Sequence, residues 1–185
     1  MDTFDEERER ERVNRIPFVR LMGMRLLSCG GGKSTMRCRM RQRLENSAGT
    51  LHGGVMGALV DMSVATALRS VVPASSGMTT VEYKVNLLKP VPGGTVTAHG
   101  SVIRLGRTLA VGSAEIRNED GEPVAFGSAT FYILEPRVPA SSGGPRRLPA
   151  RASAGRDPGA GKDPRRPRGA PGAGKAVDAS RPDKV

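Results

Sequence analysis

The sequence is poor in aromatic residues, which make up 3% of its 185 positions and include no tryptophan. None of these aromatic residues lies in residues 137–185, so that segment lacks the side chains that stack on the bases of a single-stranded nucleic acid. Only two cysteines occur, Cys29 and Cys38, with no CxxC spacing and no nearby histidine cluster. This pattern indicates neither a disulfide framework nor a zinc site, and we expect two reduced, half-buried thiols.

Long apolar runs are also missing. No stretch reaches 18 uninterrupted apolar residues, and the acidic N-terminus has no apolar segment of the kind found in signal peptides. We therefore expect a cytoplasmic protein with no membrane partner.

Basic residues are abundant, but most of the excess lies at the C-terminus. The chain has 29 Lys and Arg against 18 Asp and Glu, a formal net charge of +11. Residues 137–185 hold 12 of these basic residues and 4 acidic ones, among Pro, Gly, Ala and Ser, and include no aromatic residue. Such a segment has too little apolar surface to fold, so we expect a disordered tail and consider a nucleic-acid partner unlikely. Residues 1–136 are nearly balanced, with 17 basic and 14 acidic residues.

Apolar periodicity in residues 5–134 predicts a single α+β domain. We expect a short helix within residues 5–20 that ends near Pro17, a β-hairpin, an apolar helix, and four further strands joined as consecutive antiparallel neighbours. The hairpin strands are expected at 22–29 and 34–43, the apolar helix at 55–72, and the later strands at 78–88, 95–105, 108–118 and 122–134. Since the 55–72 segment is apolar on every face, we expect the antiparallel sheet to wrap around it. The predicted divisions are an N-terminal segment (1–20), the domain (21–136) and the tail (137–185).

Asp61 stands out because it is the only ionisable residue between His52 and Arg69. A carboxylate in an apolar interior must be neutralised, hydrogen-bonded or exposed to a pocket. The pattern alone allows either a catalytic group or a structural hydrogen bond.

His52, Gly53 and Gly54 come at the start of the same predicted helix. Glycine leaves backbone N–H groups open to a close ligand, and a helix N-terminus favours negative charge, as in an oxyanion hole. A glycine-rich turn into a helix is the plain structural alternative. Nine residues separate His52 from Asp61, or about 13 Å of helical rise, which is too far for both to serve one carbon atom. If they act together, the loop of one chain must face the acid of a partner, and the open sheet edges also favour a dimer.

The segments around these residues resemble the hotdog-fold thioesterases of the phenylacetate-pathway (PaaI) type. The similarity covers about residues 13–134 and lies in three blocks that keep the family's order. They are Asn46, Gly49, Leu51–Val55, Leu59 and Asp61; Thr80–Pro90; and Val102–Arg107.

The resemblance implies a single hotdog domain that hydrolyses an acyl-CoA thioester and assembles as a dimer or tetramer with sites at the subunit interface. It implies that Asp61 is the nucleophile or general base and that the N–H of Gly53 polarises the thioester carbonyl. Asn46 and His52 would orient the carbonyl or the attacking water from the facing loop. Thr80 falls where relatives carry a Ser or Thr that holds the water near the acid.

Coenzyme A would enter as part of the substrate, and thioester hydrolysis needs neither a metal nor another cofactor. Gly54 and the turn carrying Arg104, Gly106 and Arg107 are candidates to bind it, because guanidinium groups suit its phosphates. Two solvated arginines on a hairpin are the alternative. Lys84 and Lys89 are weaker candidates, and we expect His99 to be a surface or packing residue.

Two other functions remain open from the sequence. One is a non-catalytic acyl-CoA-binding regulator, against which the retained Asp61 argues. The other is a hydratase or dehydratase, which would call for a histidine together with the carboxylate on the helix.

Overall fold

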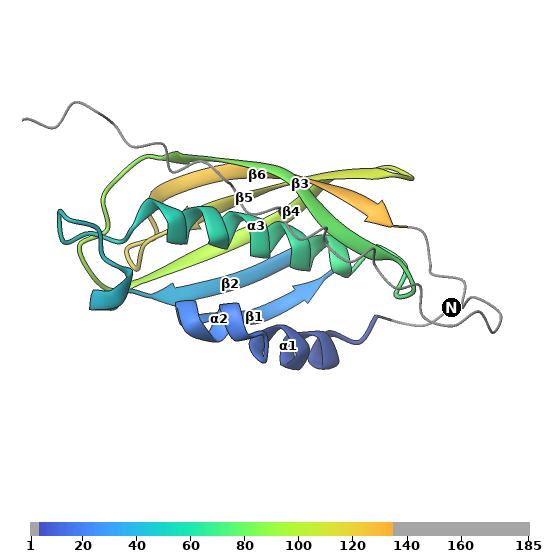
Figure 1. Cartoon of the computed structure of the whole chain (residues 1–185), viewed down its shortest axis with the longest axis horizontal. Helices are drawn as coiled ribbons and strands as arrows, with labels where there is room; N and C mark the ends of the chain where they lie inside the picture. Colours follow the sequence, from blue (N-terminus) through green and yellow to red (C-terminus); the bar gives the residue numbers. More distant parts are fainter. Residues whose placement is uncertain (1–3, 135–185) are drawn as a thin grey trace, which may run out of the picture. The chain divides into compact units, whose positions relative to one another are not determined.

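The computed structural model describes residues 4–134, which begin with two short helices (Figure 1). Helix α1 (Glu6–Asn14) starts at Asp5, whose side chain accepts a hydrogen bond from the N–H of Arg8. Helix α2 (Pro17–Met22) ends at Gly23, which has a left-handed φ of 66°. The sequence predicted α1 but not α2. Pro17 lacks an N–H group and cannot continue α1, yet its fixed φ makes it a good first residue for a second helix.

Six antiparallel strands form one sheet in the order β1-β2-β4-β5-β6-β3. Their bounds are β1 (Met24–Gly30), β2 (Lys33–Arg39), β3 (Gly77–Leu87), β4 (Thr95–Leu105), β5 (Leu109–Arg117) and β6 (Pro123–Leu134). The predicted hairpin and the predicted strand segments are confirmed, with two differences at the hairpin. Its first strand begins at Met24, after α2, and its second strand, expected to reach residue 43, ends at Arg39 before a short 3-10 helix, η1 (Gln42–Leu44). The predicted tail and the boundary at residue 136 lie outside the described residues.

The expectation that all four later strands are consecutive neighbours is wrong for β3. Strand β3 pairs with β6 at one edge of the sheet, while β4 pairs with β2 and β5. The link from β3 to β4 contains Pro90 and Pro92, which have no N–H group to offer a hairpin. Val91 between them is buried, and its carbonyl accepts a hydrogen bond from the N–H of Leu51. The link therefore crosses to the loop before the central helix and leaves β3 at the sheet edge.

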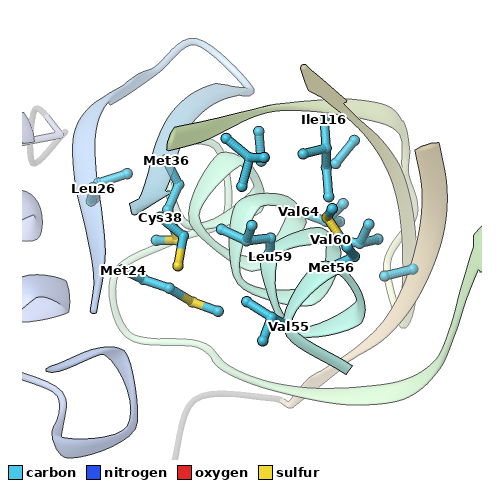
Figure 2. Close-up of a cluster of buried hydrophobic side chains, with 14 of the residues drawn as sticks. Met24, Leu26, Met36, Cys38, Val55, Met56, Leu59, Val60, Val64 and Ile116 are labelled. Carbon is cyan, nitrogen blue, oxygen red and sulfur yellow. The ribbon is translucent and has the colours of Figure 1, made fainter. Parts of the chain in front are cut away.

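The core forms where the sheet curves around helix α3 (Gly53–Arg69) (Figure 2). Leu59, Val60 and Val64 of this helix are fully buried, together with Met36 of β2 and Ile116 of β5. Strand glycines allow a close approach: a β-carbon on Gly100 would lie 2.5 Å from the carbonyl oxygen of Ser63. The α+β architecture expected from the sequence, an antiparallel sheet wrapped around an apolar helix, is confirmed.

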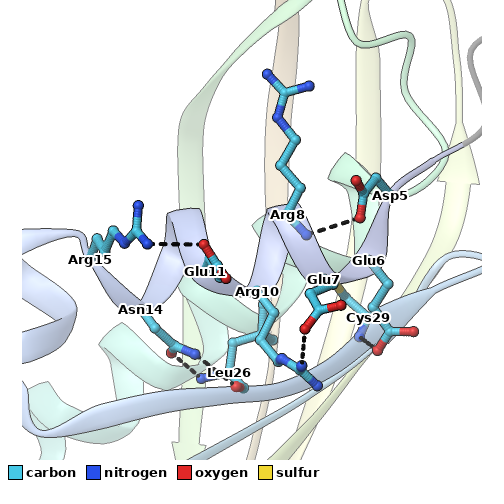
Figure 3. A network of polar contacts seen from close by, with 10 residues as sticks. All are labelled: Asp5, Glu6, Glu7, Arg8, Arg10, Glu11, Asn14, Arg15, Leu26 and Cys29. Atoms are coloured by element: carbon cyan, nitrogen blue, oxygen red, sulfur yellow. Dashed lines mark hydrogen bonds and ion pairs between the residues drawn. The ribbon is translucent and has the colours of Figure 1, made fainter.

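The two edges of the sheet differ. At the β1 edge, the amide of Asn14 donates to the carbonyl of Leu26 (3.1 Å) and accepts from its N–H (2.8 Å), as a neighbouring strand would (Figure 3). Glu6 accepts a further hydrogen bond from the N–H of Cys29 (3.0 Å). The side chains of β3 at the other edge are half-buried or exposed along its whole length. Helix α1 thus closes the β1 edge of the sheet, whereas the β3 edge stays open to pairing with another strand.

Candidate functional site

Asp61 lies two turns into α3 and meets a single polar partner on β3. The hydroxyl of Thr80 donates a hydrogen bond of 2.8 Å to Oδ1 of Asp61. Asp61 is half-buried, and none of the ion pairs within residues 4–134 includes it. The structure therefore brings together two of the residues expected at the site, across a helix and an edge strand.

The environment of Asp61 makes its carboxylate easier to protonate than that of an ordinary aspartate. Burial raises the pKa of Asp61 above the ordinary value of an aspartate, because the apolar surroundings penalise the charged carboxylate. The hydrogen bond from Thr80 opposes this effect and lowers the pKa. A carboxylate with a raised pKa is a stronger base than a solvated one, which suits proton abstraction from water.

The N-terminus of α3 offers one free backbone donor. His52 caps the helix through Nδ1, which accepts a hydrogen bond of 2.9 Å from the N–H of Gly54. Within the described residues, the N–H of Gly53 has no hydrogen-bond partner. Of the two glycines expected at the site, Gly53 is thus able to bind an incoming oxygen, while the Gly54 N–H is already occupied.

Asn46 shapes the loop that precedes α3. Its side chain accepts hydrogen bonds from the N–H groups of Ala48 (2.9 Å) and Thr50 (3.2 Å), and its amide donates to the Thr50 hydroxyl (2.9 Å). Gly49 in this turn has a φ of 72°. The structure therefore assigns Asn46 a role in holding the loop, and it does not bring Asn46 to Asp61 of the same chain.

The helix face that carries Gly53, Gly57 and Asp61 is covered by β3. A β-carbon on Gly53 would lie 2.8 Å from Cδ1 of Leu87, and one on Gly57 would lie 3.0 Å from Cε2 of Tyr83. Although both side chains lie against α3, Tyr83 is 51% exposed and Leu87 is 57% exposed. The sequence analysis missed Tyr83 and Leu87. The four-residue spacing of Gly53, Gly57 and Asp61 places these residues on one helix face, but it does not indicate which strand residues cover that face.

The arginines proposed to bind coenzyme A lie at the turn between β4 and β5. The N–H of Gly106 donates to the carbonyl of Leu109 (2.9 Å), which closes the turn, and both Arg104 and Arg107 are exposed. Arg104 pairs across the sheet with Val111, whose neighbours Ala110 and Gly112 are buried. Arg104 therefore faces away from α3, and the structure does not bring it to Asp61 of its own chain.

The weaker candidates are dispersed. The ammonium group of Lys89 pairs with Glu122 at 3.0 Å, and Lys84 is exposed on β3. His99 is exposed on β4, as the sequence predicted.

Within residues 4–134, no three His, Cys, Asp or Glu side chains are grouped as metal ligands would be. No helix in the same range is long and apolar enough to cross a membrane.

Comparison with known proteins identifies the family. The sequence model of the thioesterase superfamily matches residues 48–125, which include Asp61, Thr80 and Arg107. Human acyl-coenzyme A thioesterase 13 is 31% identical over 121 residues, which cover 63% of this chain and 84% of the human protein. An esterase of Saccharolobus solfataricus is 27% identical over 121 residues, or 65% of this chain and 86% of that protein. The chain belongs to the thioesterase superfamily.

Solved structures, including one of a thioesterase, share the fold. A conserved protein of Pseudomonas aeruginosa is 32% identical with a TM-score of 0.64, covering 68% of this chain and 98% of its own. A thioesterase of Haemophilus influenzae is 25% identical with a TM-score of 0.66, covering 72% and 92%. A variant of the phenylacetic acid degradation protein PaaI of Thermus thermophilus is 26% identical with a TM-score of 0.58, covering 63% and 97%. The chain is thus a thioester hydrolase with the hotdog fold, as the resemblance implied.

Proposed function

We propose that this thioesterase hydrolyses an acyl-CoA to a free acid and coenzyme A, with Asp61 as the reacting carboxylate. The observation that carries the proposal is the half-buried Asp61, which has no cationic partner among the described residues and is hydrogen-bonded by Thr80. The name of the human relative, acyl-coenzyme A thioesterase 13, supports coenzyme A as the thiol that is released.

Two chemical routes use the same groups. In the first, Asp61 takes a proton from a water molecule, which attacks the thioester carbon while the sulfur leaves as a thiolate and is then protonated. In the second, an Asp61 oxygen attacks the carbonyl carbon, the thiolate leaves, and water hydrolyses the resulting anhydride. Both routes place negative charge on the carbonyl oxygen, which the free N–H of Gly53 at the positive end of α3 would stabilise.

The reacting groups require two chains. Gly53 and Asp61 are eight residues apart on one straight helix, so about 12 Å of rise separates them. A thioester carbonyl cannot reach the N–H of Gly53 and the carboxylate of Asp61 in the same chain. We therefore assign each site to two subunits, with Gly53 and His52 supplied by one chain and Asp61 and Thr80 by its partner.

This assignment fixes where the symmetry axis passes. A two-fold axis that brings Gly53 of each chain to Asp61 of the other must pass near the midpoint between them, because contacts across such an axis are reciprocal. The midpoint is Gly57, and the side chain that covers it is Tyr83 of the open edge strand. The half-exposed Tyr83 and Leu87 would then be covered by the second chain.

The test is a hydrolysis assay with a panel of acyl-CoA and aryl-CoA thioesters, in which release of the free thiol is measured. We expect turnover by the wild-type protein and a loss of about a hundredfold or more for Asp61→Asn, since a catalytic base or nucleophile is removed. Asp120→Asn, a matched change in the exposed turn before β6, should leave the rate unchanged.

Folding can be separated from chemistry in the same experiment. At neutral pH we expect Asp61→Asn to unfold at a temperature no lower than that of the wild type, because its amide replaces a carboxylate whose charged form is penalised by burial. Equal rates for the wild type and Asp61→Asn would refute the assignment of Asp61. Binding of acyl-CoA without turnover in either protein would indicate a regulator in place of an enzyme.

A further inference from the structure

Basic side chains are concentrated in one part of the domain. Between Arg20 and Arg43 the sequence has seven Lys and Arg and no Asp or Glu. Four of these arginines, Arg25, Arg37, Arg39 and Arg41, form what we term the basic patch. All four are exposed, and none takes part in the ion pairs found within residues 4–134. Residues 1–136 are nearly balanced in charge as a whole, but they include this local excess of positive charge.

The strand geometry aligns these arginines on one surface. Arg25 of β1 is the direct cross-strand partner of Arg37 of β2. Their neighbours Met24, Leu26 and Met36 are buried, so the arginines point to the sheet surface that faces away from α3. Like charges directly opposite each other destabilise a strand pair. Because no acidic residue within residues 4–134 forms an ion pair with either arginine, the pair favours an external anion.

The acidic residues of nearby α1 do not compensate. Glu7 and Glu9 are paired with arginines of the same helix, and Glu11 is paired with Arg15, which directly follows the helix. Glu6 accepts a hydrogen bond from the N–H of Cys29, which lies near the C-terminal end of β1. Gly23 and α2 lie at the other end of this strand. The charge of α1 is thus largely satisfied within the helix, and the basic patch keeps its positive potential.

Apolar side chains protrude beside the patch. Phe18 and Leu21 of α2 are 46% and 64% exposed, with the exposed Arg20 between them in sequence. Helix α2 packs against β1 (Figure 1). The guanidinium carbon of Arg41 would lie 3.6 Å from a β-carbon on Gly23, the residue that ends α2. Helix α2, which carries these two exposed apolar side chains, therefore ends beside Arg41 of the patch.

We propose that the basic patch and α2 bind the surface of a membrane that contains anionic lipids, with Phe18 and Leu21 inserted between the headgroups. Guanidinium groups bind lipid phosphates, and the apolar side chains gain the free energy of leaving water for the acyl layer. A nucleic acid would satisfy the arginines but offers no apolar layer to Leu21. The sequence-based expectation of no membrane partner rested on the absence of long apolar runs, which bears on membrane-spanning helices and not on binding at a membrane surface.

The proposed membrane binding does not depend on the proposed acyl-CoA activity, but it would affect which substrates the enzyme meets. Acyl-CoA molecules with long chains are amphiphilic and partition into bilayers. If the proposed function holds, a thioesterase bound to the membrane meets such substrates where they concentrate.

The experiment measures co-sedimentation of the full-length protein with phosphatidylcholine vesicles that contain or lack phosphatidylserine. We expect binding only to the anionic vesicles, and weaker binding as the salt concentration rises. The double variant Arg37→Glu/Arg39→Glu should bind at least about tenfold more weakly. Phe18→Ser/Leu21→Ser should also weaken binding to the anionic vesicles, although its charge is unchanged.

Matched variants control for total charge and for lost apolar surface. Arg8→Glu/Arg15→Glu changes the net charge equally, at one residue of α1 and at the residue that follows the helix. Leu109→Ser removes a similarly exposed apolar side chain from β5. Both should bind like the wild type, and all variants keep residues 137–185, so any contribution of these residues is constant.

Three results would overturn the proposal: equal binding to both kinds of vesicle, no binding to either, or an equal loss of binding in the control and patch variants. A further pattern would also overturn the proposal. In it, the protein binds single-stranded RNA tightly, the patch variants abolish that binding, and Phe18→Ser/Leu21→Ser leaves vesicle binding unchanged.

Discussion

At the scale of single residues, Thr80 influences the charge of the proposed catalytic acid through one hydrogen bond. Its hydroxyl lowers the pKa of Asp61, while burial raises it. Thr80→Val removes the hydroxyl and keeps the volume, so burial acts unopposed and the pKa of Asp61 should rise further. Because both proposed routes use Asp61 in its ionised form, the acidic limb of kcat/KM against pH should move to higher pH.

The conservative variant Thr80→Ser provides the control, because it keeps a hydroxyl within reach of Asp61 and should keep the acidic limb in place. A profile for Thr80→Val that falls at all pH values by the same factor would contradict this role. It would show that the hydroxyl acts on the water or the substrate and not on the ionisation of Asp61.

At the scale of elements, α1 stabilises the β1 edge through the amide of Asn14. Asn14→Ala leaves the N–H and the carbonyl of the fully buried Leu26 without their partner, which should lower the free energy of unfolding by about 1–2 kcal/mol. Urea denaturation at a fixed protein concentration measures this change. Arg15→Ala, which removes a surface ion pair one residue later, should cost less than about 0.5 kcal/mol. Equal losses for both variants would show that Asn14 does not support the edge.

The elements also show what the sequence could predict. Met36 and Cys38 alternate with Arg37 and Arg39, so local periodicity was sufficient to predict the hairpin and the outward direction of the arginines. The position of β3 was not predictable in this way, because strand order depends on contacts between distant segments and the proline-containing link resembled a turn. The contact of Thr80 with Asp61 followed from the family resemblance and not from spacing. Nothing local indicated that Tyr83 would cover Gly57.

At the scale of the whole molecule, the two proposed partners would bind different surfaces of one chain. The basic patch faces away from α3, while the proposed catalytic groups lie where α3 meets β3. A second chain at β3 and a membrane at β1 and β2 would therefore occupy opposite edges of the sheet and would not compete. The closed β1 edge further favours a discrete dimer, because only one edge remains open to strand pairing.

The proposed axis near Gly57 and Tyr83 predicts which residue should cross-link to itself. In an antiparallel pair of β3 strands centred there, cysteines at position 83 of the two chains lie within disulfide distance. Cysteines at position 79 would be roughly 25 Å apart, at about 3.3 Å for each residue. Mild oxidation followed by non-reducing electrophoresis should yield dimers for Tyr83→Cys or its neighbour Lys84→Cys, and none for Thr79→Cys.

The native thiols should contribute little to this reaction, because Cys29 and Cys38 are buried and desolvation raises the pKa of each to about 11. Dimers formed by Thr79→Cys alone would move the axis by about four residues along β3. Gly53 of one chain would then no longer face Asp61 of the other, and the shared site would be refuted even if Asp61 proved essential for hydrolysis. Cross-linking at position 83 or 84 together with an inactive Asp61→Asn would instead support two equivalent sites, related by an axis at the one glycine of α3 that Tyr83 covers.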